Sequence, residues 1–337
     1  MNYFKNTTIQ LAIVLFTGVL VFGACKKDNG MDNPTANKIA PEKGSGGDVL
    51  TMTGSDLAGI TSIVFETDNV PAFFNPNFNT ESAVVFRVPD TASGGQQNIV
   101  FTNSKGKQWL VPFNVVAVAN ITTAFPLDFQ AGSTVTLTGI NLESVTKVVL
   151  EGTSDEATIV SKSKKQLVLK MPSTTANTCK LVITNGSGTM TTTQVFTYIT
   201  NAYGIFKDAF ATGMDDWSWS LTNTNSSSNI IVGTASLQAA YNGDWGGMQL
   251  HWAAPINLTP YKYVTFYIKG ADVDKKMKFN FNWTNDQTLT IPANVWTYYK
   301  IDLGIFKNNG VSSLETFVMQ INDSPKTLYF DDILLVK

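Results

Sequence analysis

The chain has 337 residues, of which 43% are hydrophobic, 15% are charged and 11% are aromatic, and this indicates a globular protein of two or three domains. The net charge is −2 and Arg87 is the single arginine among 24 basic residues, which argues against a nucleic-acid-binding surface. With one histidine and two cysteines, the chain cannot form a Cys/His zinc site or a disulfide framework, whereas chemistry based on carboxylates remains possible.

The N-terminus carries a secretory signal pattern. Lys5 precedes an apolar run over residues 9–22, which is shorter than the ~20 residues of a membrane-spanning helix, the alternative interpretation. The sequence Val-Phe-Gly-Ala-Cys at 21–25 resembles the lipobox of bacterial lipoproteins, with Phe22 in place of the usual leucine. This resemblance implies a signal peptide over residues 1–24 and lipidation of Cys25. The following Lys-Lys-Asp-Asn-Gly resembles the export tail of Bacteroidetes lipoproteins, which implies the cell surface and the outer membrane, with the lipid as the sole membrane attachment.

Residues 25–37 are polar and show no periodicity, which predicts a tether. Beyond them, short runs rich in Val, Ile, Thr and Phe alternate with clusters of Gly, Asn, Ser and Pro. No long segment keeps a 3.6-residue apolar period, so the sequence predicts an all-β protein.

An internal repeat follows the tether. Thr-Gly at 53–54 matches Thr-Gly at 138–139, and the apolar runs at 63–66 and 148–151 match at the same offset. Each copy ends in a strand with Thr-Asn and a glycine turn, at 102–106 and 184–188. A repeat of this length is a whole domain, and its short strands predict immunoglobulin-like sandwiches at 38–118 and 119–200.

The second copy, with Gly-Ser-Thr-Val-Thr-Leu-Thr-Gly-Ile-Asn-Leu at 132–142, Met-Pro and Thr-Asn-Gly, resembles an IPT/TIG domain. The resemblance implies that the two domains are spacers. The first copy departs from it by an insert over residues 69–78 with three phenylalanines, which we expect to fold onto its own sandwich rather than to form a binding surface. Cys179 lies in an expected strand as a small buried hydrophobe.

The segment 203–337 is where we look for function, because it holds six of the seven tryptophans. Alternation in four expected strands, at 248–252, 264–269, 278–283 and 317–322, assigns one face to a core that includes Trp252 and Trp283. The opposite face carries uncharged polar groups that suit a ligand rich in hydroxyls. These candidates are Gln249, His251, Tyr267, Asn280, Asn282, Gln320 and Asn322. Trp245, in a glycine-rich turn, is either a platform for a sugar ring or a cap on the sandwich.

The same segment resembles a carbohydrate-binding jelly roll of the galactose-binding-like type, with Asp-Trp-Ser-Trp at 216–219 and Leu-Tyr-Phe-Asp-Asp-Ile-Leu-Leu-Val at 328–336 among its motifs. The resemblance adds Trp217 and Trp219 to the candidate site. It also implies a possible structural calcium, for which Asp208, Asp331 and Asp332 could supply oxygen ligands. Satisfaction of these carboxylates by loop amides is the alternative. No cofactor is required.

Together these features resemble the surface glycan-binding lipoproteins of Bacteroidetes. The resemblance implies a non-catalytic protein that captures a polysaccharide for surface glycoside hydrolases and an outer-membrane importer. The alternatives are a glycosidase or lyase that uses paired carboxylates, for which the polar face offers none, and an adhesin that binds protein.

We expect the Cys25→Ala variant to leave the membrane fraction, because the substitution removes the thiol that would carry the lipid. Fractionation of cells that express the full-length chain measures this, with Cys179→Ala as the matched control. A Cys25→Ala protein that stays membrane-bound and exposed at the cell surface would contradict lipidation at this residue.

Overall fold

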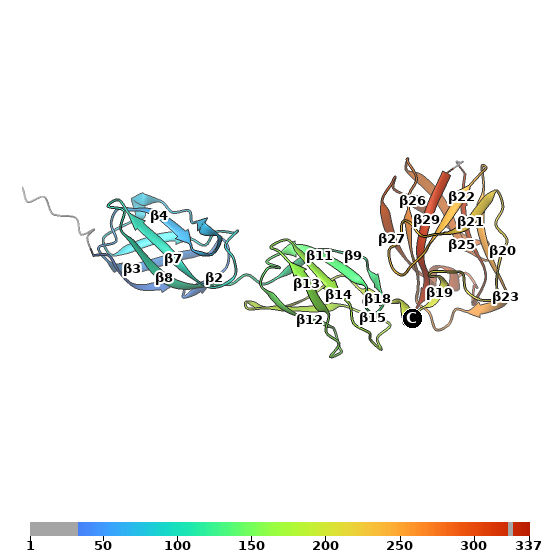
Figure 1. Cartoon of the computed structure of the whole chain (residues 1–337), viewed down its shortest axis with the longest axis horizontal. Coiled ribbons are helices and arrows are strands. Elements are labelled where there is room, and N and C mark those ends of the chain that lie inside the picture. Colours follow the sequence, from blue (N-terminus) through green and yellow to red (C-terminus); the bar gives the residue numbers. More distant parts are fainter. Residues whose placement is uncertain (1–32, 323–325) are drawn as a thin grey trace, which may run out of the picture. The chain divides into compact units, whose positions relative to one another are not determined.

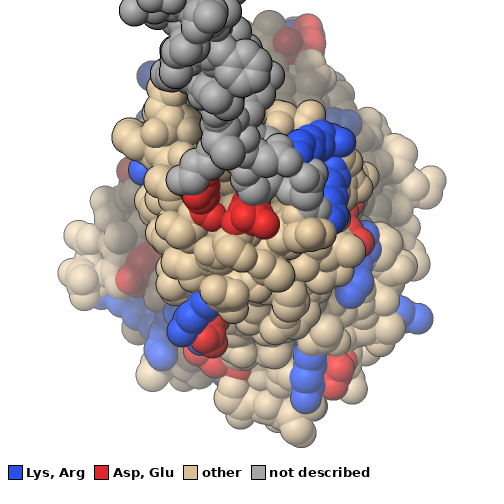
Figure 2. All heavy atoms as spheres, turned by 90° about the vertical axis from the view of Figure 1, so that its left-hand side faces the viewer, with Lys and Arg blue, Asp and Glu red and all other residues tan. Residues whose placement is uncertain are grey.

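The computed structural model describes residues 33–322 and 326–337, so the expected signal peptide, Cys25 and most of the expected tether lie outside the described residues. The chain divides into two compact units, residues 33–117 and 118–337 (Figure 1). The prediction of an all-β protein is confirmed within the described residues. None of their helices has the length and apolar character needed to cross a bilayer. On the face seen in Figure 2, acidic and basic side chains are scattered among uncharged ones.

The first unit is a sandwich of two sheets. Its elements are β1 (Thr35–Ala40), β2 (Lys43–Gly44), β3 (Val49–Ser55), β4 (Ile60–Phe65), η1 (Thr67–Asn69), β5 (Val70–Pro71), η2 (Pro76–Phe78), β6 (Ala83–Arg87), β7 (Gly95–Asn103) and β8 (Gln108–Val115). The sheet orders are β1-β3-β6 and β2-β8-β7-β4-β5. Alternate residues point inward, so that Leu50 and Met52 share the core with Phe101. β1 starts inside the expected tether, because Thr35 pairs with Ser55.

The second unit begins with another sandwich. Its elements are β9 (Asn120–Phe125), β10 (Asp128–Phe129), β11 (Thr134–Ile140), β12 (Val145–Leu150), β13 (Thr158–Lys162), β14 (Gln166–Lys170), β15 (Thr178–Cys179), β16 (Leu181–Asn185), β17 (Gly188–Thr191), β18 (Phe196–Tyr198) and η3 (Ile199–Asn201). The sheet orders are β13-β14-β11-β9, β12-β16-β17 and β10-β18-β15. Cys179 is buried in its core as expected, and burial, with Glu151 and Asp155 nearby, raises the pKa of its thiol to about 12.

The repeated motifs have the same structural roles in both sandwiches. A Cβ atom on Gly54 would lie 2.0 Å from the carbonyl oxygen of Thr35, and one on Gly139 would lie 1.9 Å from that of Asn120, so only glycine fits either position. The asparagine that ends each Thr-Asn pair is buried and caps the turn after it. The Oδ1 atom of Asn103 accepts hydrogen bonds from the amides of residues 105 and 107, and that of Asn185 from the amides of residues 187 and 188.

Only part of the insert in the first domain folds onto its own sandwich as the sequence predicts. Phe74 packs against the core of its own sandwich and forms a β-bridge with Phe86. Phe73 and Phe78 do not fold inward: their exposed fractions are 76% and 66%. The expectation that the insert covers its own sandwich is therefore wrong for these two side chains.

The C-terminal part, from residue 203, is a β-sandwich of a six-stranded and a five-stranded sheet. Its elements are β19 (Tyr203–Phe206), β20 (Met214–Asp216), β21 (Leu221–Ser226), β22 (Ser236–Tyr241), β23 (Gly247–Asn257), β24 (Tyr263–Lys269), β25 (Lys275–Phe281), β26 (Thr284–Ile291), β27 (Trp296–Asp302), α2 (Gly304–Lys307), β28 (Ser313–Ile321) and β29 (Lys326–Val336). One sheet has the order β21-β22-β29-β24-β27, with β19 also paired to β29, and the other β20-β23-β28-β25-β26. Between them lies a core rich in aromatic side chains, such as Phe266, Phe279 and Phe317.

The C-terminal sandwich is joined to the second domain through buried polar contacts. The phenolic oxygen of Tyr267, on β24, accepts hydrogen bonds from the amides of Leu127 (2.6 Å) and Asp128 (3.3 Å). Its ring packs edge-on against Phe125, and the hydroxyl of Tyr298 donates to Asp128 Oδ1 at 3.4 Å. Tyr267 and Asp128 are completely buried.

Three carboxyl groups, those of Asp128, Asp331 and Asp332, are buried near this joint and influence one another. Burial raises the pKa of Asp128 to about 8, against the opposing effect of hydrogen bonds from Thr197 and Tyr298. Burial likewise raises the pKa of Asp331 and that of Asp332. Because an unfolded aspartate titrates near ~4, the folded joint holds more protons than the unfolded chain between that pH and about 8.

The stability of the second unit should therefore fall as the pH rises through this window. We expect the melting temperature of residues 118–337 to drop between about pH 5 and about pH 8.5. In the Asp128→Asn variant the drop in melting temperature should be smaller, by about 2–4 °C for each kcal/mol of pH-dependent unfolding free energy that the substitution removes. Thermal melts across this range measure the effect, with the exposed Asp302→Asn as control. Equal pH dependence in the wild type and Asp128→Asn would contradict the assignment.

Candidate functional site

The outer face of the five-stranded sheet collects most of the predicted polar residues in three rows. The strand registers place His251 opposite Thr316 in the first row. In the second row Val318 lies between Gln249 and Asn280, and in the third Gln320 lies between Gly247 and Lys278. The face therefore extends across β23, β28 and β25. The row of His251 and the row of Asn280 are largely buried, since the exposed fractions of these two side chains are 9% and 2%.

Two tryptophans reach this face from the segment that continues β20. The amide of Trp217 donates to the carbonyl of Gln249 at 2.8 Å, and Trp219 exchanges two backbone hydrogen bonds with Gly247. Residues two apart on a paired segment share a face, so both indoles lie on the polar side. Trp217 stacks on His251 with ring centroids 3.5 Å apart and planes within 10°.

Trp219 is placed by the lack of a side chain at Gly247. A Cβ atom there would lie 2.2 Å from the indole of Trp219, so that the ring occupies the space above the glycine. From this position it stacks against Trp283, with centroids 5.7 Å apart and an angle of 28° between the rings. Gly247 therefore allows Trp219 to lie close to the sheet.

Trp245 has a fixed backbone and an exposed ring. Its φ of 57° is left-handed, and its carbonyl accepts hydrogen bonds from Trp219 Nε1 (2.7 Å) and Gln320 Nε2 (3.0 Å). The side chain is 49% exposed, with the Lys278 ammonium 6.0 Å from the ring centroid. These contacts hold the loop while the indole stays accessible.

Trp283 belongs to this face and not to the core, which corrects the sequence-based assignment. β25 ends at Phe281, and both Asn282 (φ 52°) and Trp283 (φ 56°) adopt the left-handed conformation. Strand alternation therefore ends before Trp283, whose side chain is 54% exposed and does not point into the core. Trp252, by contrast, is buried in the core as predicted.

Several predicted polar residues hold the tryptophans in place. Asn280 Oδ1 accepts a hydrogen bond from the amide of Trp283 at 3.0 Å. Asn282 Oδ1 accepts from the amides of residues 315 and 316, and its Nδ2 donates to the carbonyl of residue 313, which ties the Trp283 turn to β28. Gln320 supports Trp245 as described above.

The charged groups on this face are largely paired. The carboxylate of Asp286 on β26 receives Asn280 Nδ2 at 2.7 Å and the ammonium of Lys278 at 3.1 Å. Asp215 lies opposite His251 on the same face, with its Oδ2 3.7 Å from the imidazole Nδ1. The sequence-based expectation that no carboxylate lies on the polar face is thus wrong for Asp215 and for Asp286.

Tyr267 does not share the face, contrary to expectation. Its strand, β24, lies in the other sheet, where the second domain covers it. Gln249 is half-buried on the outer face of the five-stranded sheet, and Asn322 is exposed directly after β28. The structure thus gathers Trp217, Trp219, Trp245, Gln249, His251, Asn280, Asn282 and Gln320.

Of the residues considered for calcium, Asp208 and Asp331 accept hydrogen bonds from backbone amides, whereas neither carboxylate oxygen of the buried Asp332 has a hydrogen-bond partner within the described residues. Asp208 Oδ1 accepts hydrogen bonds from the amides of Thr234 and Ala235, and the carboxylate of Asp331 accepts from those of Ile231 and Asp332. In residues 33–322 and 326–337, no group of three or more His, Cys, Asp and Glu is arranged to hold a metal. Calcium binding by Asp208, Asp331 and Asp332 stays a prediction.

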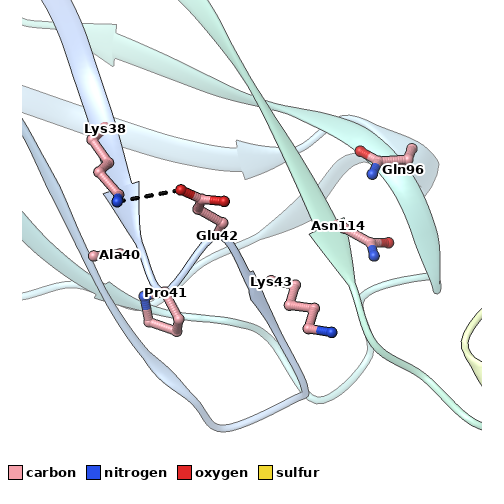
Figure 3. Close-up of a pocket in the computed structure, with 7 residues that line it drawn as sticks. All are labelled: Lys38, Ala40, Pro41, Glu42, Lys43, Gln96 and Asn114. Carbon is pink, nitrogen blue, oxygen red and sulfur yellow. Dashed lines mark ion pairs between the residues drawn. The ribbon is translucent and has the colours of Figure 1, made fainter.

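A separate hollow of about 530 Å³ lies on the first domain beside the turn between β1 and β2 (Figure 3). Lys38 and Glu42 form an ion pair of 3.3 Å at its edge, and Lys43, Gln96 and Asn114 line it further. The lining has no aromatic ring, so this hollow differs chemically from the outer face of the C-terminal sandwich that carries the tryptophans.

Comparison with known proteins bears on the fold. The IPT/TIG domain model matches residues 34–114 and 119–198, while none of the curated proteins matches the chain by sequence. The surface glycan-binding protein PbSGBP-B of Prevotella bryantii is similar in structure, with a TM-score of 0.54 and 14% identity over 90% of this chain and 98% of that chain.

Two further solved structures are similar at lower scores. SGBP-B from a xyloglucan utilization locus of Bacteroides uniformis has a TM-score of 0.47 and 16% identity, covering 90% of this chain and 99% of that chain. A point mutant of the carbohydrate-binding module CBM29-2 has a TM-score of 0.29 and 16% identity, over 40% of this chain and 91% of that chain. The chain therefore consists of two IPT/TIG domains and a C-terminal β-sandwich, a fold that it shares with a surface glycan-binding protein of Bacteroidetes.

Proposed function

We propose that this chain is a non-catalytic surface protein that binds a neutral polysaccharide on the face defined by Trp217, Trp219, Trp245 and Trp283, called here the tryptophan face. One observation carries the proposal: three of these indoles are about half exposed, yet their backbones are held by hydrogen bonds. Exposed aromatic side chains that are fixed before a ligand arrives favour binding, because little conformational freedom remains to be lost.

Sugar rings match this face chemically. Their C–H faces pack on indoles, and their hydroxyls both donate and accept hydrogen bonds, as do the amides of Gln249 and Gln320. Each stacking or amide contact contributes on the order of 1 kcal/mol, so affinity comes from several contacts together.

Charge supports a neutral ligand. Lys278, whose ammonium lies 6.0 Å from the Trp245 ring centroid, already pairs with Asp286, and Asp215 lies at the other end of the face beside His251. An acidic polysaccharide would meet the carboxylates of Asp215 and Asp286, and the Lys278 ammonium beside Trp245 is already paired. The glycosidase alternative gains no support from Asp286, since its carboxylate is held by Lys278 and Asn280.

The proposal places this binding activity at the cell surface. Lipidation of Cys25 would attach the chain to the outer membrane, and the two TIG domains would separate the tryptophan face from the anchor. A polysaccharide concentrated there would be presented to surface glycoside hydrolases and to an outer-membrane importer. The support for these partners is the resemblance of the whole chain to glycan-binding lipoproteins.

The second unit should carry oligosaccharide binding. We expect residues 118–337 to bind oligosaccharides of a suitable neutral polysaccharide with the affinity of the full chain, since they contain the whole tryptophan face. This fragment is preferable to 203–337 because Tyr267 would lose its buried partners in the shorter one. Calorimetry with fragments of neutral polysaccharides, including xyloglucan and mixed-linkage glucan, is the measurement. Binding of a protein ligand without competition by soluble glycans would instead favour an adhesin.

Single tryptophan variants locate the site. We expect Trp245→Ala and Trp283→Ala each to weaken binding roughly tenfold, which corresponds to ~1.4 kcal/mol of lost stacking. Their melting temperatures should change little, because both rings lie outside the core.

Val295→Ala is the matched control, since Val295 is also 54% exposed but precedes β27 in the other sheet. Calorimetry gives the affinities and thermal melts give the stabilities. Unchanged affinity in both tryptophan variants would remove these indoles from the site, whereas a large loss of stability would identify them as caps of the sandwich.

A further inference from the structure

The insert of the first TIG domain is a fixed loop with two outward phenylalanines. It closes the edge of β6: the amide of Arg87 donates to the carbonyl of Phe73 at 3.1 Å, and the amide of Thr80 donates to the carbonyl of Ala83 at 2.9 Å. Asn75 Oδ1 caps η2 by accepting from the amide of Asn77. The second TIG domain closes the matching edge with β13 instead.

The two exposed rings take no part in this closure. Phe74 supplies the core contact of the loop, whereas Phe73 and Phe78 are more exposed than any tryptophan of the tryptophan face. Together with Asn75 and Arg87 they border a pocket of about 240 Å³, which Phe74 and Phe86 also line. The fold therefore holds the backbone of two exposed aromatic residues beside a small cavity.

Arg87 gives this pocket a polar edge. Its Nη1 atom donates to the carbonyl of Gly47 at 2.8 Å, and it forms no ion pair within the described part of the chain. A guanidinium presents five N–H donors in a planar fork, so donors remain for a ligand with closely spaced oxygens. Arg87 is the single arginine of the chain.

We propose that Phe73, Phe78, Asn75 and Arg87 form a second sugar-binding site on the first TIG domain, which engages the same polysaccharide as the tryptophan face. The proposal rests on the proposed function. The rings would pack on the C–H face of a sugar, while the guanidinium and the Asn75 amide would meet its oxygens.

The size of the patch favours a sugar over a protein partner. At about 150–250 Å² per aromatic side chain, Phe73 and Phe78 expose roughly 300 Å² together. A stable protein interface buries about 800 Å² on each partner. On β3 and β6, Val49 and Val85 extend the apolar lining, whereas Thr51 and Arg87 interrupt it. With Val49 47% exposed, the apolar area still stays well below that of a protein interface.

A second site on one chain would act through avidity. A long polysaccharide can occupy both sites of one molecule, and the second contact is then intramolecular. A short oligosaccharide cannot gain in this way. The full chain should therefore hold a polymer more tightly than residues 118–337 do, while the two proteins bind an oligosaccharide at the tryptophan face equally well.

The test compares retardation in native gels that contain xyloglucan or mixed-linkage glucan, whichever retards residues 118–337. We expect the full chain to bind the polymer at least roughly tenfold more tightly than residues 118–337, and Phe73→Ala/Phe78→Ala to abolish this difference. Val160→Ala is the matched control, because Val160 is 60% exposed on β13, the edge that replaces the loop in the second TIG domain.

The outcomes separate the two proposals. If residues 118–337 bind but the full chain gains nothing, or if the double phenylalanine variant keeps the gain, the second site is overturned. If residues 118–337 and the full chain both fail to bind any neutral glycan, the proposed function itself fails. Thermal melts of the double variant show whether a loss of the gain reflects unfolding, and Arg87→Lys, which keeps the charge but removes the fork, should reduce the gain without changing the fold.

Discussion

The candidate site depends on one constraint: an exposed indole can act as a preformed platform only if contacts other than burial hold the backbone that carries it. Here hydrogen bonds to the main chain supply that restraint. The carbonyl of Trp245 receives two side-chain donors, and the amide of Trp283 is held by Asn280. Because both residues adopt left-handed backbone angles, which cost energy outside glycine, these bonds also stabilise the turns that direct the rings outward. The polar rows of the sheet are therefore best understood as the support of an aromatic surface.

Much of the fold could be predicted from the sequence because its signals are local. The Thr-Gly and Thr-Asn repeats reflect backbone requirements, a close approach at Gly54 and a capped turn at Asn103, that hold in any sandwich of this kind. Strand alternation likewise separated Leu250 and Phe279 from the polar side, since the period of two follows from the pleat alone. Trp217 and Trp219 entered the candidate site only through family resemblance, although their spacing of two residues already carried the information.

The failures arise where a side chain's environment is decided by distant parts of the chain. Alternation places Tyr267 on an outer face, but it does not reveal which sheet β24 joins or that another domain covers it. Alternation wrongly assigns Trp283 to the core, because the strand ends where the backbone of Asn282 changes to the left-handed conformation. Asn280 and Gln320 were expected to bind a ligand, but they bind the main chain of Trp283 and Trp245. An amide side chain that suits a ligand hydroxyl suits a main-chain carbonyl or amide equally well.

Gly247 shows how this arrangement separates recognition from architecture. No atom of this buried glycine needs to touch a ligand, yet the indole of Trp219 occupies the space that any larger residue would fill. A framework of such hidden positions can remain constant while the exposed aromatic residues are exchanged one at a time. If the tryptophan face binds a saccharide as proposed, an exchange of one exposed indole would change which saccharide is preferred while the sandwich keeps its stability.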